Sequence, residues 1–107
     1  MLVVEEVART VAVDVIRLTR TVEPGLVDLA NQARRAGTSV ALNLAEGLGR
    51  TGRDRARHLR ISMGSLREVQ MAVHILHGVD ALPAACAEQL LRQLDRLGGL
   101  LHGLLRR

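Results

Sequence analysis

The stretch SVALNLAEGLGRTGRDRARHLR, from Ser39 to Arg60, sets the organisation of this 107-residue chain. It begins as a helical run of small and apolar residues and then passes two glycines, Gly47 and Gly49. The arginines that follow are Arg50, Arg53, Arg55, Arg57 and Arg60. Because glycine punctuates helices, the stretch predicts one helix, a tight turn and the start of a second, arginine-rich helix.

The composition favours helices over strands. Hydrophobic residues make up 48% of the chain and charged residues 24%, which is typical of one folded domain. Phe, Tyr and Trp are absent, so aliphatic side chains must fill the core, and these suit close-packed helices better than a sheet. We therefore expect a single all-α domain over residues 1–107.

Four segments show helical periodicity, with apolar residues recurring every three or four positions. They span residues 4–22, 26–47, 51–76 and 83–104. The second segment carries a narrow stripe of small residues, and the motif from Thr51 to Asp54 resembles a capping box that opens the third. Long helices joined by short turns fold back on one another, which predicts an antiparallel up-down four-helix bundle.

The sequence does not indicate a membrane or a secreted protein. The opening MLVVEEVART carries Glu5 and Glu6 where a signal peptide would have basic residues, and no apolar run is long enough to cross a bilayer. The single cysteine, Cys86, cannot form an internal disulfide and is expected to be a small, reduced, buried residue. We therefore expect a cytoplasmic protein with no membrane partner.

A second set of apolar residues points away from the predicted core on a helical wheel. The set consists of Val13, Ile16, Leu42, Ile61, Ala72 and Ile75. Isolated exposed apolar residues are common in monomers, but several on adjacent helices favour a subunit interface. We therefore expect a homo-oligomer.

Positive charge is concentrated in the middle of the chain. Residues 1–33 carry a net charge of −2, residues 34–67 carry +6 and residues 68–107 carry none. Four arginines of the third segment fall within about 80° of one another on a helical wheel, beside its apolar stripe. They are Arg53, Arg57, Arg60 and Arg67, here called the basic ridge, and Gly64 lies among them.

The basic ridge has more than one interpretation. A row of guanidinium groups can bind the phosphates of RNA or DNA, and an oligomer would offer several rows to one strand. The ridge can equally be a solvated face that pairs with acids of its own or a neighbouring subunit. Base recognition is disfavoured because no aromatic side chain can stack on bases. The expected phosphate contacts are Arg50, Arg53, Arg57, Arg60 and Arg67, with Arg34 and Arg35 in support.

Two motifs resemble a known family. The run QARRAGTSVALNLAEGLGR, followed by RHLRISMGSLRE, closely resembles the bacterial four helix bundle protein family, which is encoded within intervening sequences of large-subunit ribosomal RNA genes. It is also similar to the accessory variability protein of diversity-generating retroelements. The matching positions are Gln32, Arg34, Arg35, Ala36, Ser39, Val40, Asn43, Leu44, Ala45, Glu46, Gly47, Gly49 and Arg50, then Gly64, Ser65, Leu66 and Glu68.

The resemblance implies an antiparallel four-helix bundle that assembles as a homopentamer. For the retroelement relatives it implies a basic barrel that associates with nucleic acid and with a reverse transcriptase. The expected function is therefore a non-enzymatic, nucleic-acid-binding accessory scaffold of a ribonucleoprotein or retroelement-type complex. The alternative is a scaffold that docks an acidic or polymerase-like protein without binding nucleic acid.

Two positions depart from the family pattern. Ala41 stands where the family often has proline, and Leu48 stands where it often has an aromatic residue. The first change predicts a straighter second helix, because proline interrupts helical hydrogen bonding. The second, together with the missing aromatic residues of other helices, predicts a repacked core.

The polar residues of the first motif are expected to be structural. Ser39, Asn43 and Glu46 lie on or beside one side of the second helix, where buried or inter-subunit hydrogen bonds would fix the register. Glu46 can also pair with Arg50, four residues later. A catalytic role for Glu46 is not expected, because no second acid, base or nucleophile lies at a useful spacing. The glycines of the motif pattern are Gly47, Gly49 and Gly64.

The remaining polar residues do not form a recognisable site. His74 and His77 are three residues apart, but no further ligand follows, so we expect no metal. Ser62 and Ser65 lie near His58 in sequence without a carboxylate to orient the histidine, which gives no support to a hydrolase. We expect neither enzyme activity nor a cofactor.

Overall fold

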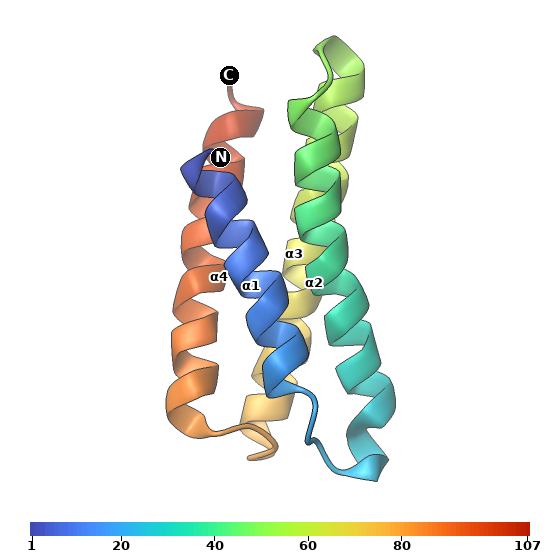
Figure 1. The fold of residues 1–107 in the computed structure, drawn as a ribbon, viewed down its shortest axis with the longest axis vertical. Coiled ribbons are helices and arrows are strands. Elements are labelled where there is room, and N and C mark those ends of the chain that lie inside the picture. Colours follow the sequence, from blue (N-terminus) through green and yellow to red (C-terminus); the bar gives the residue numbers. More distant parts are fainter.

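The computed structural model describes all 107 residues and contains four α-helices and no strand, which confirms the all-α class. α1 spans Val3–Leu18, α2 spans Val27–Leu48, α3 spans Gly52–Gly78 and α4 spans Ala84–Leu105. A short 3₁₀ helix, η1, spans Pro24–Leu26. Figure 1 shows the chain running down α1, up α2, down α3 and up α4, so that both termini lie at the same end.

The four helices enclose one aliphatic core. Each helix packs against two others, and the interface between α2 and α3 is the largest. Every helix contributes its predicted stripe, and Val11, Val40, Leu66 and Leu94 are among the fully buried side chains. The small residues of α2 allow its neighbours to come close, because a Cβ on Gly37 would lie only 3.6 Å from the side chain of Val15 of α1.

The connection between α1 and α2 is longer than the sequence predicts. The periodicity extends to Val22, but α1 ends at Leu18, and Pro24 opens η1 rather than α2. Thr19 explains the early end. Its hydroxyl donates to the carbonyl of Val15 at 2.6 Å, and its own carbonyl accepts a hydrogen bond from Arg34 of α2. A carbonyl used in this way does not continue the helical ladder.

The predicted capping box at the start of α3 is wrong. Thr51 has the extended backbone of an N-cap, but its side chain makes no capping hydrogen bond. Asp54 instead turns toward the preceding turn, where its Oδ2 accepts a hydrogen bond from Arg50 Nη1 at 2.7 Å. A charged partner makes the stronger hydrogen bond, so Asp54 serves the turn rather than the helix end.

The exposed apolar set is largely confirmed. Five of its members are exposed, and they are Val13, Ile16, Leu42, Ile61 and Ile75. Ala72 is wrongly placed in the set, because it is only 4% exposed and belongs to the core. Since α3 packs against α2 as well as α4, its buried side is wider than a single stripe.

The surface differs from the sequence expectation at one more position. Cys86 is exposed rather than buried, because it lies in the first turn of α4, before the buried leucine stripe begins.

None of the four helices combines the length and the hydropathy that a membrane-spanning helix requires.

Candidate nucleic-acid interface

The turn between α2 and α3 is built from glycines at its critical positions. Gly52 begins α3 with a φ of +59°, in the left-handed region that favours glycine. Gly47 lies where the two helices touch, since a Cβ there would be 3.1 Å from Leu59 Cδ2 and 3.2 Å from His58 Cβ. The glycine of the sequence motif therefore permits the close packing of α2 on α3.

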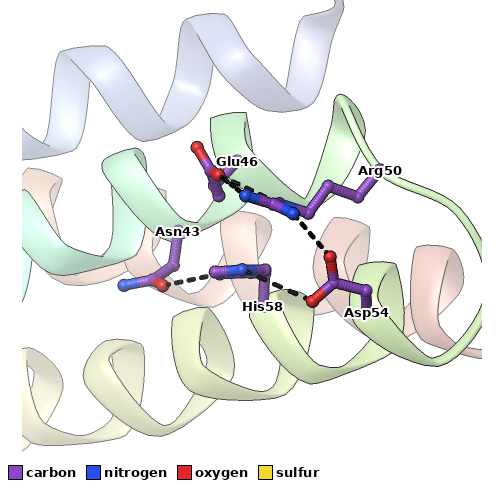
Figure 2. Close-up of polar contacts among 5 residues, drawn as sticks. All are labelled: Asn43, Glu46, Arg50, Asp54 and His58. Carbon is purple, nitrogen blue, oxygen red and sulfur yellow. Dashed lines mark hydrogen bonds and ion pairs between the residues drawn. The ribbon is translucent and has the colours of Figure 1, made fainter.

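A polar network crosses this turn. Figure 2 shows its members, which are Asn43, Glu46, Arg50, Asp54 and His58. Arg50 Nε donates to Glu46 Oε1 at 2.9 Å, so the predicted pair of these residues is confirmed. Arg50 also donates to Asp54, whose second oxygen lies 3.9 Å from His58 Nε2. The network links the last turns of α2 to the first two turns of α3.

Asn43 fixes the orientation of the histidine. Its Nδ2 donates to the carbonyl and the hydroxyl of Ser39 at 3.0 and 3.1 Å, so its Oδ1 faces His58. His58 Nδ1 lies 3.2 Å from that oxygen and therefore carries the proton of this hydrogen bond. Ser39 in turn is 2.8 Å from Ser65 of α3. The motif residues Ser39 and Asn43 thus join α2 to α3 within one chain.

The ion pairs change the acid–base properties of their members. Hydrogen bonding to Arg50, and its positive charge, lower the pKa of Glu46 below the ordinary value of 4.5. Hydrogen bonds to Glu46 and Asp54 raise the pKa of Arg50. The charge of Arg50 is therefore compensated by two carboxylates. This arginine, expected as a main phosphate contact, belongs structurally to the network.

Arg34 is also engaged within the chain. Its Nε donates to the hydroxyl of Thr19 at 2.8 Å, and its Nη2 donates to the carbonyl of the same residue. Its Nη1 donates to Asn31 Oδ1 at 3.0 Å. The guanidinium thus ties the end of α1 to α2, and we assign Arg34, expected as a supporting phosphate contact, to helix packing.

The basic ridge is free in the structure. Its side chains Arg53, Arg57, Arg60 and Arg67 are all exposed along α3, and no carboxylate lies within 4.0 Å of their guanidinium groups. Arg35 of α2 is exposed and unpaired as well. Gly64 lies on the same surface, where a Cβ would meet no atom within 4 Å. Nothing in the chain neutralises these arginines or covers the ridge.

The other polar residues do not gather into a further site. The structure brings together no group of three His, Cys, Asp or Glu side chains that could hold a metal ion. His77 lies 3.9 Å from Glu88 of α4, whereas His74 is exposed. Ser62 is buried and donates to the carbonyl of Val40 at 2.8 Å.

Sequence reasoning missed two members of the network. No carboxylate was expected to orient His58, and Asp54 was expected to belong to a capping box. A usable signal exists, because Arg50, Asp54 and His58 follow one another at four-residue intervals, the spacing at which side chains on a helical path meet. The turn after Gly49 hides this signal, since the spacing rule assumes a continuous helix.

Comparisons with other proteins agree with this fold. A family model described as 23S rRNA-intervening sequence protein matches residues 1–103. The crystal structure of a protein of unknown function from the S23 ribosomal protein family of Bacteroides thetaiotaomicron superposes with a TM-score of 0.85 at 20% sequence identity, covering 98% of this chain and 100% of that one. At this identity the likeness shows the fold alone. A search among curated proteins finds no match.

Proposed function

Because the chain belongs to the 23S rRNA-intervening sequence protein family, we propose that it is a non-enzymatic accessory scaffold that binds the backbone of RNA or DNA. The basic ridge, with Arg35 in support, makes the phosphate contacts. The partner is a ribonucleoprotein or a retroelement-type complex in the cytoplasm, and a reverse transcriptase is one candidate component.

One observation carries the proposal: four arginines share the outer face of α3 and no carboxylate pairs with any of them. Unpaired guanidinium groups offer forked donors to phosphate oxygens, and neutralising phosphates releases counterions from the nucleic acid. The guanidinium groups of Arg34 and Arg50 are not free in this way, since each is hydrogen-bonded to partners within the chain.

The proposed scaffold is a homo-oligomer of antiparallel bundles. The exposed apolar residues, above all Leu42 with 65% of its surface exposed, support association. The family resemblance implies five copies. Repeating the ridge in an assembly would let a single strand bind several ridges at once, which raises the overall affinity without new contacts.

The test replaces Arg53, Arg57 and Arg60 together by glutamate. We expect the variant to lose binding to a labelled single-stranded RNA while keeping its helical circular dichroism. A matched control replaces Arg92, Arg96 and Arg106, which are also exposed but lie on or directly after α4. It changes the net charge equally and should weaken binding far less. Equal losses in both variants would contradict a specific ridge.

Absorbance gives an independent test. The chain has no Phe, Tyr or Trp, so the purified protein should be almost transparent at the wavelength where nucleic acid absorbs. An absorption band that co-elutes at low salt and disappears at high salt would support the proposal. A transparent peak, with a protein partner that survives nuclease treatment, would favour the alternative scaffold that docks an acidic or polymerase-like protein.

A further inference from the structure

A groove opens between α3 and α4 directly beside the basic ridge. Its volume is about 280 Å³, and Arg67 of the ridge forms part of its wall. The other lining residues come from both helices and are Met63, Leu66, Gln70, Asp95, Gly98 and His102. A strand whose phosphates follow the ridge therefore passes the mouth of this groove.

The floor of the groove is apolar and open. Gly98 of α4 lies against Leu66 of α3, since a Cβ on the glycine would be 3.5 Å from Leu66 Cδ2. Because glycine has no side chain, the space in front of Leu66 stays open. Met63, which is half-buried, adds a thioether, and thioethers make favourable contacts with aromatic rings. The floor can therefore cover one face of a planar ring.

One end of the groove carries a polar pair. Gln70 Nε2 donates to Asp95 Oδ1 at 3.3 Å. Asp95 is exposed, and no cation of the chain lies within 4.0 Å of its carboxylate. An amide nitrogen has two hydrogens and each carboxylate oxygen has two acceptor positions, so the pair can make further hydrogen bonds. It presents one donor followed by two acceptors.

The groove favours a base over a phosphate. The negative charge of Asp95 repels phosphate, which keeps the nucleic acid backbone on the ridge outside. His102 lies seven residues after Asp95 on α4, so the two side chains are about 10.5 Å apart along the helix axis. That length leaves room for one base between them.

Guanine has the matching hydrogen-bonding edge. Its O6 accepts, and its N1–H and N2–H donate side by side, in the order that Gln70 and Asp95 require. Adenine and cytosine each have one amino group next to an acceptor nitrogen, and uracil has one N–H between two carbonyls. An ionised carboxylate only accepts hydrogen bonds, so guanine alone can donate to both of its oxygens through this edge.

We propose that this groove binds a guanine base of the strand whose phosphates lie on the basic ridge. Gln70 donates to O6, Asp95 accepts from N1–H and N2–H, and the ring lies against Leu66 and Met63. Arg67, at the rim, contacts the phosphate of the same nucleotide. The inference rests on the proposed function and adds a base preference to it, because phosphate contacts carry no sequence information and base-edge contacts do.

The first test compares labelled oligouridines that differ at one central nucleotide. Fluorescence anisotropy at constant salt measures the affinity of strands with guanosine, inosine or adenosine at that position. We expect the guanosine strand to bind at least about 5-fold more tightly than the adenosine strand. Inosine lacks the N2 amino group, so its strand should lie between the two.

The outcomes separate the base site from the ridge. Equal affinities for the guanosine and adenosine strands would overturn the base site and leave the proposed function standing. Absence of binding to every strand would overturn the proposed function and this inference with it. An inosine strand that binds as tightly as the guanosine strand would contradict the contact between Asp95 and N2–H.

The second test uses Asp95→Asn, which removes one of the two acceptors. The ratio of guanosine to adenosine affinity should fall to about 1, whereas binding to plain oligouridine should persist. The matched control is Glu68→Gln, which removes the same charge from an exposed residue of α3 outside the groove and should keep the ratio. An unchanged ratio in Asp95→Asn, or an equal loss in both variants, would overturn the proposal.

A third test fills the groove. Gly98→Leu places a side chain on the floor and should abolish the guanosine preference. Gly99→Leu is its control, because a Cβ at Gly99 meets no atom within 4 Å, and it should keep the preference. Circular dichroism verifies that both variants retain their helices. A preference that survives in folded Gly98→Leu would overturn the site, and if that variant does not fold, Asp95→Asn decides.

Discussion

Asn43 of α2 and His58 of α3 meet through a contact of 3.2 Å between Asn43 Oδ1 and His58 Nδ1. The asparagine cannot turn away freely, because its Nδ2 is already held by Ser39. The contact therefore fixes how the start of α3 lies against α2. Since Arg57 and Arg60 flank His58 in sequence, the same contact determines where the basic ridge stands on the molecule.

This relationship predicts a measurable coupling between Asn43 and His58. Asn43→Ala, His58→Ala and the double variant form a cycle in which we expect a coupling of about 0.5–1.5 kcal/mol in the free energy of unfolding. Urea unfolding followed by circular dichroism measures it. A cycle between Asn43 and exposed His74 is the control and should give additive effects; additive effects for Asn43 and His58 would contradict the contact.

Gly47→Ala should destabilise the fold although alanine is the better helix former. The added Cβ would lie 3.1 Å from Leu59 Cδ2 and 3.2 Å from His58 Cβ, so these side chains must move by a few tenths of an ångström. We expect a net loss of about 1–3 kcal/mol, typical of an overpacked interface. Gly64→Ala is the control, since its Cβ would meet open space, and it should raise stability by up to about 1 kcal/mol. Thermal unfolding of both variants checks the pair, and similar shifts would be inconsistent with close packing at Gly47.

Neighbouring arginines of α2 should behave differently. Arg34→Ala removes the hydrogen bonds to buried Thr19 and should lower the free energy of unfolding by about 1–3 kcal/mol. Arg35→Ala removes an exposed, unpaired side chain and should change stability by less than about 0.5 kcal/mol, while weakening the proposed RNA binding. Denaturant unfolding and RNA titration of each variant separate the two roles. Reversed results would show that Arg34 is the exposed contact.

The Glu46–Arg50 pair should give the stability a pH dependence of known sign. The pKa of Glu46 is lower in the folded chain than its ordinary value, so the pair stabilises the fold above the unfolded-state pKa. That stabilisation is lost as the pH falls through the folded-state pKa. Wild-type protein should therefore exceed Glu46→Gln in stability near neutral pH, and the difference should vanish in acid.

Carboxyl NMR of Glu46 provides the direct measurement. Its titration midpoint should lie below 4.5 in the unchanged protein and move upward in Arg50→Ala, because the hydrogen bond and the positive charge are both removed. An unaltered midpoint in Arg50→Ala would mean that another group lowers the pKa.

The helical content and much of the core were accessible from periodicity. Apolar residues recurring every three or four positions can be buried together only on a helix, and Val11, Val40 and Leu94, which lie in the periodic segments, are buried in the core. Ala72 was misplaced because a wheel describes one helix at a time. The packing of α3 against two other helices, α2 and α4, enters only when the bundle is assembled.

In the candidate interface, too, some features could be predicted from the sequence and others could not. Clustering on one helix predicted the basic ridge, and local spacing predicted the pair of Glu46 with Arg50. Two hydrogen bonds join residues 15 positions apart, one between Arg34 and Thr19 and the other between Asn43 and His58. Patterns among neighbouring residues do not indicate contacts between residues so far apart in the sequence.

The sequence by itself determined the class of fold and the position of the charge along the chain, because both depend on periodicity within single helices. Only the tertiary structure decided which arginines are free, since that depends on which partners from other helices lie within hydrogen-bonding distance. The sequence alone does not show that Arg34 and Arg53 differ in their partners. Packing of α2 against α1 engages the first with Thr19, whereas the outer face of α3 leaves the second exposed to solvent.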